Sequence, residues 1–270
     1  MKSLDTVIES FKLVYKNPKI MLIPLAISAL SFIFIFITGL FFGVGIDDIF
    51  RGIKNAKYFS SPPLIIILLF SLLIYPILVG MLISSGIQAL KGKLNLSRAF
   101  NEAKKKYLSL LGVFLISTII EIVLLFVLLI FRFVLLIFGV FGLIISERLL
   151  DILAFFYLIV AIIFYLISEI CITVLLFEAN TVVFTENRKA FDAVKRSFHI
   201  GKEKLLSIIA TNVFFFILVF GTMLILVIPI FLTGSIMFII FVILFIGFIL
   251  PVKEILPVVF YYNYNLKNLK

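Results

Sequence analysis

Residues 205–252 read LLSIIATNVFFFILVFGTMLILVIPIFLTGSIMFIIFVILFIGFILPV, a run of 48 residues without a charged side chain. As a single helix this run would be about 72 Å long, more than twice the roughly 30 Å of a bilayer's hydrocarbon core. The run must therefore fold back on itself. Proline and glycine at 229–235 place the turn there, because these residues end one helix and allow the next to begin. The stretch predicts two membrane-spanning helices.

The rest of the chain has the same character. Of its 270 residues, 64% are hydrophobic and 14% are charged, whereas a soluble domain is roughly half apolar and about a quarter charged. The mean hydropathy is +1.31. This composition excludes a soluble enzyme and a disordered chain, and the single cysteine, Cys171, excludes a disulfide scaffold. A multi-pass membrane protein is the class that remains.

Four further apolar runs are long enough to cross a bilayer: 20–46, 64–90, 107–131 and 152–177. With the pair at 205–252, they predict an all-α polytopic membrane protein with six transmembrane helices. One more run, 133–145, is about 20 Å long as a helix and too short to cross. It either extends the third span, lies at the membrane interface or re-enters the membrane, and we favour the first two.

Basic residues mark one side of this arrangement. The N-terminal segment, two of the connections and the C-terminal end carry 19 of the 24 Lys and Arg residues, and the connections on the other side carry 5. The positive-inside rule therefore places both termini in the cytoplasm of a cell-membrane protein. The net charge of +10 follows from this topology. No nucleic-acid partner is predicted, because no basic soluble domain is present.

Three of the basic segments have the pattern of amphipathic helices. Residues 4–15 place apolar side chains on one face and charged ones opposite, and Ala99-Phe100 and Ala190-Phe191, 91 residues apart, begin similar stretches. Each segment leads into two spans. The chain is therefore predicted to be one membrane domain of three repeated units, each an amphipathic helix followed by a helical hairpin. The approximate units are 1–90, 91–180 and 181–270.

These amphipathic helices have two interpretations. They are either interfacial connectors, with the apolar side among acyl chains and the lysines among headgroups, or a cytoplasmic collar that binds a partner or anionic lipid. We favour the connectors. In both cases anionic headgroups are expected to contact five basic side chains: Lys104, Lys105, Lys106, Lys195 and Arg196.

Two stretches beside predicted spans carry a family resemblance. They are VIESFKLVYKNPK at 7–19, and ANTVVF at 179–184 with KAFDAVKRSF at 189–198. The chain resembles a group of six-helix prokaryotic membrane proteins typified by the membrane domain of some glycerophosphoryl diester phosphodiesterases. The resemblance implies a six-helix fold and no catalytic residue. In that group the activity belongs to a separate soluble barrel that needs several histidines, whereas this chain has only His199.

Glu121 and Glu169 are the carboxylates well inside predicted spans. A charge within the bilayer is costly unless it is paired or hydrated, so such residues mark candidate sites. The two lie about 21 Å and about 13 Å along neighbouring helices from their cytoplasmic ends. With Asn212 they form a candidate intramembrane polar site for a proton or cation. The alternative, which we favour, is a protonated carboxyl hydrogen-bonded within the bundle, with Asn212 among its possible partners.

The sequence contains no nucleotide-binding glycine loop and too few histidines for a triad or a multi-histidine metal site. We therefore expect no catalytic residue, metal or cofactor. The expected function is that of a non-enzymatic scaffold or accessory protein that contacts the lipid bilayer, a membrane-protein partner or a second copy. The alternative is a small permease or lipid-handling transporter that uses Glu121 and Glu169. It ranks second because transporters gather more polar groups at the midplane.

Overall fold

The structure, a computed structural model, describes residues 2–42, 62–143, 155–156, 159–160, 163–164, 172–233 and 245–264. The elements assigned over these residues are all helical, which confirms the predicted all-α class for this part of the chain. Among the described residues, four helices are long and apolar enough to cross a membrane, or five if the bent pair Lys2–Lys16 and Pro18–Phe34 is one span. The chain is thus a membrane-embedded helical protein. Six spans in three units remain a prediction, since most of 152–177 lies outside the described residues.

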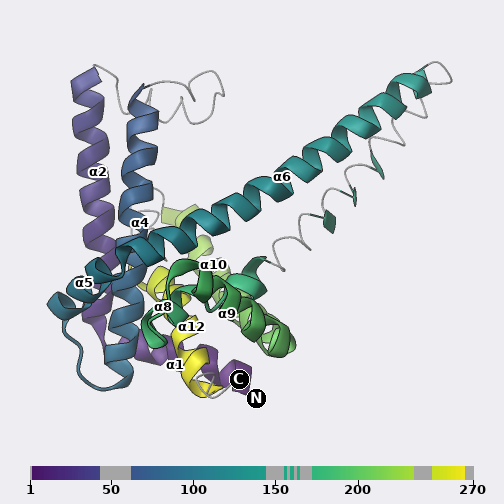
Figure 1. Ribbon diagram of the computed structural model, residues 1–270. Helices are drawn as coiled ribbons and strands as arrows, with labels where there is room; N and C mark the ends of the chain where they lie inside the picture. Colours follow the sequence, from purple (N-terminus) through teal and green to yellow (C-terminus); the bar gives the residue numbers. More distant parts are fainter. Residues whose placement is uncertain are drawn as a thin grey trace.

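The first half of the chain forms an upright hairpin with a bent base. Its elements are α1 (Lys2–Lys16), the 3-10 turn η1 (Pro18–Met21), α2 (Leu22–Phe42) and α4 (Pro62–Leu90). The bend of 88° between α1 and the following span falls where Pro18 cannot continue a helix. The helix α2 packs along α4, and Figure 1 shows them side by side.

The next helices are α5 (Leu96–Lys105) and α6 (Tyr107–Leu143). With 37 residues, α6 is about 55 Å long. Residues 133–143 therefore extend the third predicted span, which is one of the two favoured placements. Figure 1 shows α6 leaving the base obliquely, away from the α2–α4 hairpin.

The second half of the chain contains α8 (Ala179–Thr185), α9 (Ala190–Glu203), α10 (Leu205–Thr233), the π-helical turn η3 (Phe245–Ile249) and α12 (Leu250–Asn263). The helix α10 continues through Pro229 as far as Thr233, where the described residues stop, so the predicted turn at 229–235 lies partly outside them. The predicted sixth span, in contrast, ended before Lys253, whereas α12 continues ten residues beyond that lysine. The reason is packing, because most side chains from Ile255 to Tyr261 are buried in the core.

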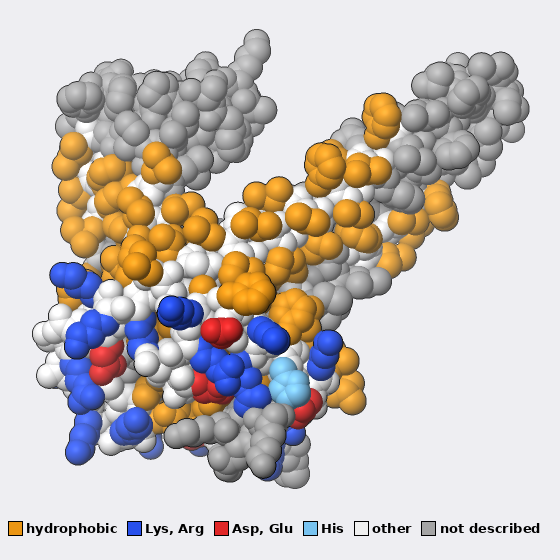
Figure 2. All heavy atoms as spheres, viewed as in Figure 1, with side chains coloured by type: hydrophobic (Ala, Val, Ile, Leu, Met, Phe, Trp, Pro, Cys, Tyr) orange, Lys and Arg blue, Asp and Glu red, His pale blue; other side chains and the backbone are white. Residues whose placement is uncertain are grey.

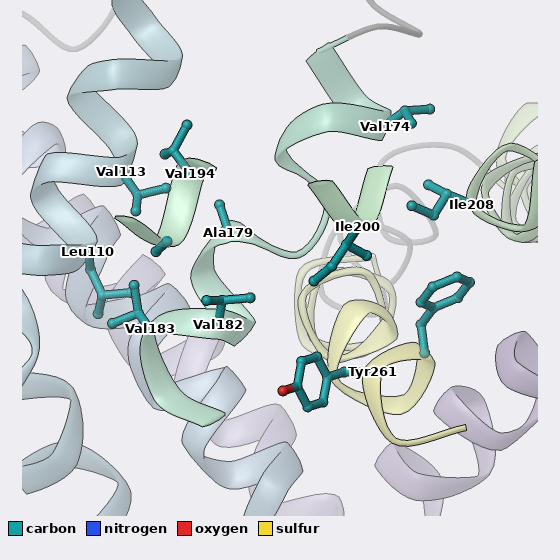
Figure 3. Packing of buried hydrophobic residues seen from close by; sticks show 12 residues of the cluster. Leu110, Val113, Val174, Ala179, Val182, Val183, Val194, Ile200, Ile208 and Tyr261 are labelled. Carbon is teal, nitrogen blue, oxygen red and sulfur yellow. The ribbon is translucent and has the colours of Figure 1, made fainter. Parts of the chain in front are cut away.

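Two clusters of buried side chains form that core, and α12 contributes to both. One cluster joins the end of α1, the start of α2, α4 and α12. The other joins α6, α8, α9, the start of α10 and the end of α12. Figure 3 shows Leu110, Val183, Ile200 and Tyr261, from four of these helices, within the second cluster. The helix α12 thus holds the two halves of the protein together.

The charged side chains gather at this packed end. In Figure 2 they cover the lower part of the molecule, over α5, α8 and α9, while apolar side chains cover α2, α4 and α6 above them. The two ends of the described chain also meet there. The Ser3 hydroxyl lies 3.0 Å from the Tyr264 hydroxyl, and the Lys2 Nζ lies 5.9 Å from the centre of the Tyr264 ring.

Candidate functional site

An opening separates the α2–α4 hairpin from α6 above the packed base (Figure 2). At the bottom of this opening, the ring of Tyr75 on α4 packs against Phe114 on α6, with ring centroids 5.3 Å apart. Above that contact the two helices separate. Leu69 and Leu73 of α4 are 55% and 51% exposed, which shows that nothing in the described chain covers this part of the hairpin.

Tyr75 brings together polar groups from three helices. The carboxyl group of Glu254 on α12 is near enough to its hydroxyl to act on it electrostatically. The Glu121 carboxyl on α6 is near enough to act on the same hydroxyl electrostatically. Glu121 lies two turns beyond Phe114 on the same face of α6 and is exposed, while Glu254 is half-buried. Two carboxyl groups therefore flank one tyrosine within the apolar part of the protein.

The structure describes two of the three residues of the polar site predicted from sequence, Glu121 and Asn212. Glu121 lies at the opening, whereas Glu169 lies outside the described residues. Asn212 is half-buried on α10, and its amide nitrogen donates a hydrogen bond to the Ile208 carbonyl of the same helix at 2.9 Å. The helix α10 packs mainly against α1 and α9.

Two members of the group, Tyr75 and Glu254, are absent from the site predicted from sequence. Lys253 ends the charge-free run, so the sequence pattern places Glu254 at the cytoplasmic end of the sixth predicted span. The continuation of α12 places Glu254 within the helix instead. A repeated pattern was the available signal, since Glu178 and Glu254 each precede a Val-Val-Phe sequence by four residues.

Glu178 is a fully buried carboxyl group in the turn before α8. The residue is 0% exposed, and neither carboxylate oxygen has a hydrogen-bond partner within the described chain. The nearby Thr181 hydroxyl favours the charged form, but it does not reach hydrogen-bond geometry. Burial dominates and raises the pKa of Glu178 well above its usual range. The backbone N–H of Glu178 donates to the Ser197 hydroxyl at 3.2 Å, which ties this turn to α9.

The three amphipathic helices bury faces that are rich in small residues. Each face packs on the helical bundle: α1 on α10 and α12, α5 on α4, and α9 on α6 and α8. The buried residues are Ser3, Thr6, Val7, Ser10 and Val14 of α1, Ala99 and Ala103 of α5, and Ala193, Val194, Ser197, Ile200 and Gly201 of α9.

The same helices expose large apolar side chains beside their basic residues. Ile8 and Tyr15 of α1 are 37% and 75% exposed, Phe100 of α5 is 45% exposed, and Phe191 of α9 is 74% exposed. Each helix therefore has three faces: a small one against the protein, a bulky apolar one, and a charged one. Such a helix is suited to the boundary between acyl chains and headgroups.

The five basic residues predicted to contact headgroups fall into two sets. Lys104, Lys105 and Lys195 are exposed. The Lys106 Nζ donates hydrogen bonds to the Val183 carbonyl at 2.6 Å and to the Asn187 side chain at 3.0 Å. Burial lowers the pKa of Lys106. The guanidinium of Arg196 is 3.2 Å from the carboxylate of Glu186. Lys106 and Arg196 thus bind the protein itself, and headgroup contact remains a prediction for all five residues.

Glu186 is the centre of a polar network at the packed end. Its carboxylate accepts hydrogen bonds from Arg188 at 2.7 Å, from Arg196 at 3.2 Å and from the Tyr261 hydroxyl at 3.1 Å. The network joins the segment after α8 to α9 and α12. It is a structural link at the polar end of the protein and lies apart from the opening.

Comparison of the chain with protein-family models, curated proteins and solved structures finds no match. The resemblance to the phosphodiesterase membrane domain therefore remains an expectation.

Proposed function

We propose that this chain is a multi-pass cell-membrane protein without enzymatic activity, a scaffold or accessory protein that receives a membrane partner at the opening beside α6. Both termini lie on the cytoplasmic side in this proposal. The observation that carries it is the exposed carboxyl group of Glu121 on an apolar helix.

The exposure of α6 supports a partner. Only 11% of the residues in its apolar window Tyr107–Leu124 are buried, and α10 has the same value over Leu205–Thr222. The corresponding values for α4 and α12 are 56% and 50%. Lipid can cover apolar side chains, but a carboxyl group facing lipid is costly. A transmembrane helix that brings a basic or hydrogen-bonding side chain to Glu121 removes that cost.

The packed end of the protein supports its proposed position at the membrane interface. Its three-faced helices place lysines and large apolar side chains side by side, as an interfacial helix requires. Their arrangement also supports the proposed repeat. The helix α5 packs on α4, which is the last helix of the first unit, and α1 packs on α12, which is the last helix of the third unit. The excess of basic residues at this end supports its cytoplasmic location.

One observation favours a second candidate function, a small permease. Tyr75, Glu121 and Glu254 come from three helices and lie together in the apolar part of the protein. Such a group is suited to exchanging a proton or binding a cation. We rank the permease second because Glu121 is exposed at an open side, whereas transport sites are enclosed between helices.

A pair of cross-linking positions tests the scaffold proposal. A photoreactive amino acid is placed at Ile122 of α6 or, as a matched control, at Phe32 of α2, since both side chains are 58% exposed. In native membranes, Ile122 should give a discrete protein adduct that Phe32 does not give. Glu121→Leu should reduce this adduct roughly five- to thirtyfold, as expected from an interhelical polar contact of about 1–2 kcal/mol. Equal adducts at Ile122 and Phe32, or no effect of Glu121→Leu, would overturn the proposal.

The permease makes a different prediction. The purified protein is screened for thermal stabilisation by ions and soluble metabolites, with Glu121→Gln as the comparison. The scaffold proposal expects no soluble ligand whose effect depends on Glu121. A ligand that stabilises the natural chain but not Glu121→Gln would replace the scaffold with the permease.

A further inference from the structure

A groove lies between α2, α4 and α5, and no sequence pattern predicts it. Its volume is about 410 Å³, and all of its lining residues are apolar. They include Ala26 and Ile27 of α2, Ile77 and Met81 of α4, and Leu96 and Phe100 of α5. We propose that this groove binds one acyl chain of an anionic phospholipid whose headgroup lies against the basic residues of η1 and α5. The inference rests on the position in the membrane proposed above.

The lining excludes polar ligands. A polar group placed in the groove would lose its hydrogen bonds to water and find no side-chain donor or acceptor to replace them. A flexible hydrocarbon chain has no polar group that would be left unpaired in such a lining.

The position of the groove selects a lipid. Its walls include Leu22 and Leu30 of α2, each of which is 56% exposed on the apolar outer side of the hairpin. The groove is therefore continuous with the surface that faces acyl chains. At its other wall stands α5, whose Phe100 is 45% exposed beside the basic face of that helix. A chain that enters from the bilayer thus has its headgroup at the level of α5.

The charges around the groove select an anionic headgroup. Lys19 comes three residues before Leu22, Lys93 comes three residues before Leu96, and Lys104 follows Phe100 by one helical turn. All three lysines are exposed. The carboxylate of α5, Glu102, does not offset them, because it is paired with Arg98 at 2.9 Å. Each such lysine near a membrane surface contributes about a fivefold preference for anionic lipid.

The chain contains no tryptophan, so a single introduced tryptophan reports on one position. Phe100→Trp places the probe in the groove wall. The control, Leu73→Trp, places it on α4 outside the groove lining, at a side chain that is 51% exposed. Each variant is reconstituted in nanodiscs with phosphatidylglycerol or phosphatidylcholine whose acyl chains carry bromine, which quenches tryptophan fluorescence on contact.

The inference predicts that brominated phosphatidylglycerol quenches Phe100→Trp at a several-fold lower mole fraction than brominated phosphatidylcholine does. The control should not distinguish the two lipids. Adding Lys104→Gln or Lys19→Gln to Phe100→Trp should weaken the preference about fivefold each. Adding Ala26→Phe, which fills the groove, should abolish the preference and leave the Leu73→Trp signal unchanged.

Equal quenching of Phe100→Trp by the two lipids would overturn the inference, and so would an equal preference at Leu73→Trp. In both cases the proposed position in the membrane stands, because lipid still reaches both probes. If neither probe is quenched by either lipid, the proposed position in the membrane is wrong, and the groove proposal fails with it.

Discussion

The helices α4 and α12 differ from α6 and α10 in what covers them. About half of the residues in the apolar windows of α4 and α12 are buried, against 11% in those of α6 and α10. The buried end of α4 contains glycine, serine and glutamine at positions 80–88, whereas the exposed windows are dominated by Leu, Ile and Phe. Apolar content thus makes a helix suitable for the membrane, and small or polar residues decide whether it packs on its neighbours.

The largest expected difference in stability between the packed and the exposed helices comes from removing one phenylalanine from each. Phe260 of α12 is 0% exposed and stacks on Tyr264 with ring centroids 4.2 Å apart. Phe216 of α10 is 65% exposed. Phe260→Ala should destabilise the protein by about 3–5 kcal/mol because it leaves a cavity, and Phe216→Ala by no more than about 0.5 kcal/mol. Thermal unfolding in detergent measures both, and equal losses would contradict the division into packed and exposed helices.

Replacing one glycine in a packed helix and one in an exposed helix by leucine tests the same difference between the two kinds of helix. A Cβ atom on Gly80 of α4 would lie 2.6 Å from the Leu110 side chain and 3.0 Å from the Ala103 Cβ, whereas one on Gly221 of α10 meets nothing within 4 Å. Gly80→Leu should therefore cost about 1–3 kcal/mol through overpacking. Gly221→Leu should leave the unfolding temperature unchanged. A stable Gly80→Leu variant would show that α5 and α6 are not held as closely to α4 as the structure places them.

These contacts explain which features the sequence can and cannot predict. A helical span depends on local apolar content, so α4, α6 and α10 were found near their observed positions. The extension of α12 past Lys253 depends on burial of Ile255 and its neighbours against α4, a contact between residues far apart in the chain. The meeting of Tyr75 with Glu254 has the same origin. A single sequence contains no direct signal for such contacts.

A smaller effect comes from the buried carboxyl group of Glu178. Its pKa is raised in the folded protein by burial, so the stability of the fold is greatest below the pKa of the unfolded chain. Stability then falls as the pH rises towards the folded pKa, by about 1.4 kcal/mol per pH unit. Glu178→Gln should remove this slope and be more stable than the natural chain at pH 7. Unfolding temperatures between pH 5 and pH 7 measure the slope, and parallel curves for the two proteins would refute the burial of Glu178.

The smallest expected loss of stability comes from removing a hydrogen bond between two helices, and the control removes a hydrogen bond within one helix. The Ser84 hydroxyl of α4 donates to the Glu102 carboxylate of α5, and the Thr222 hydroxyl of α10 donates to the Leu218 carbonyl of its own helix at 2.8 Å. Ser84→Ala should cost about 1 kcal/mol, because it leaves a partly buried carboxylate with one donor fewer. Thr222→Val should be neutral, since the Leu218 carbonyl keeps its helical partner.

The pH dependence of Ser84→Ala distinguishes that hydrogen bond from simple packing. Burial acts to raise the pKa of Glu102, but the hydrogen bonds from Ser84, Arg98 and Gln88 outweigh it and lower the pKa. The stability that Glu102 contributes is therefore present above the pKa of the unfolded chain and is lost as the pH falls through the folded pKa. The cost of Ser84→Ala, measured by thermal unfolding, should shrink as Glu102 becomes protonated. A cost that stays constant down to low pH would assign Ser84 a packing role alone, and close approach by small residues would then suffice to join α5 to α4.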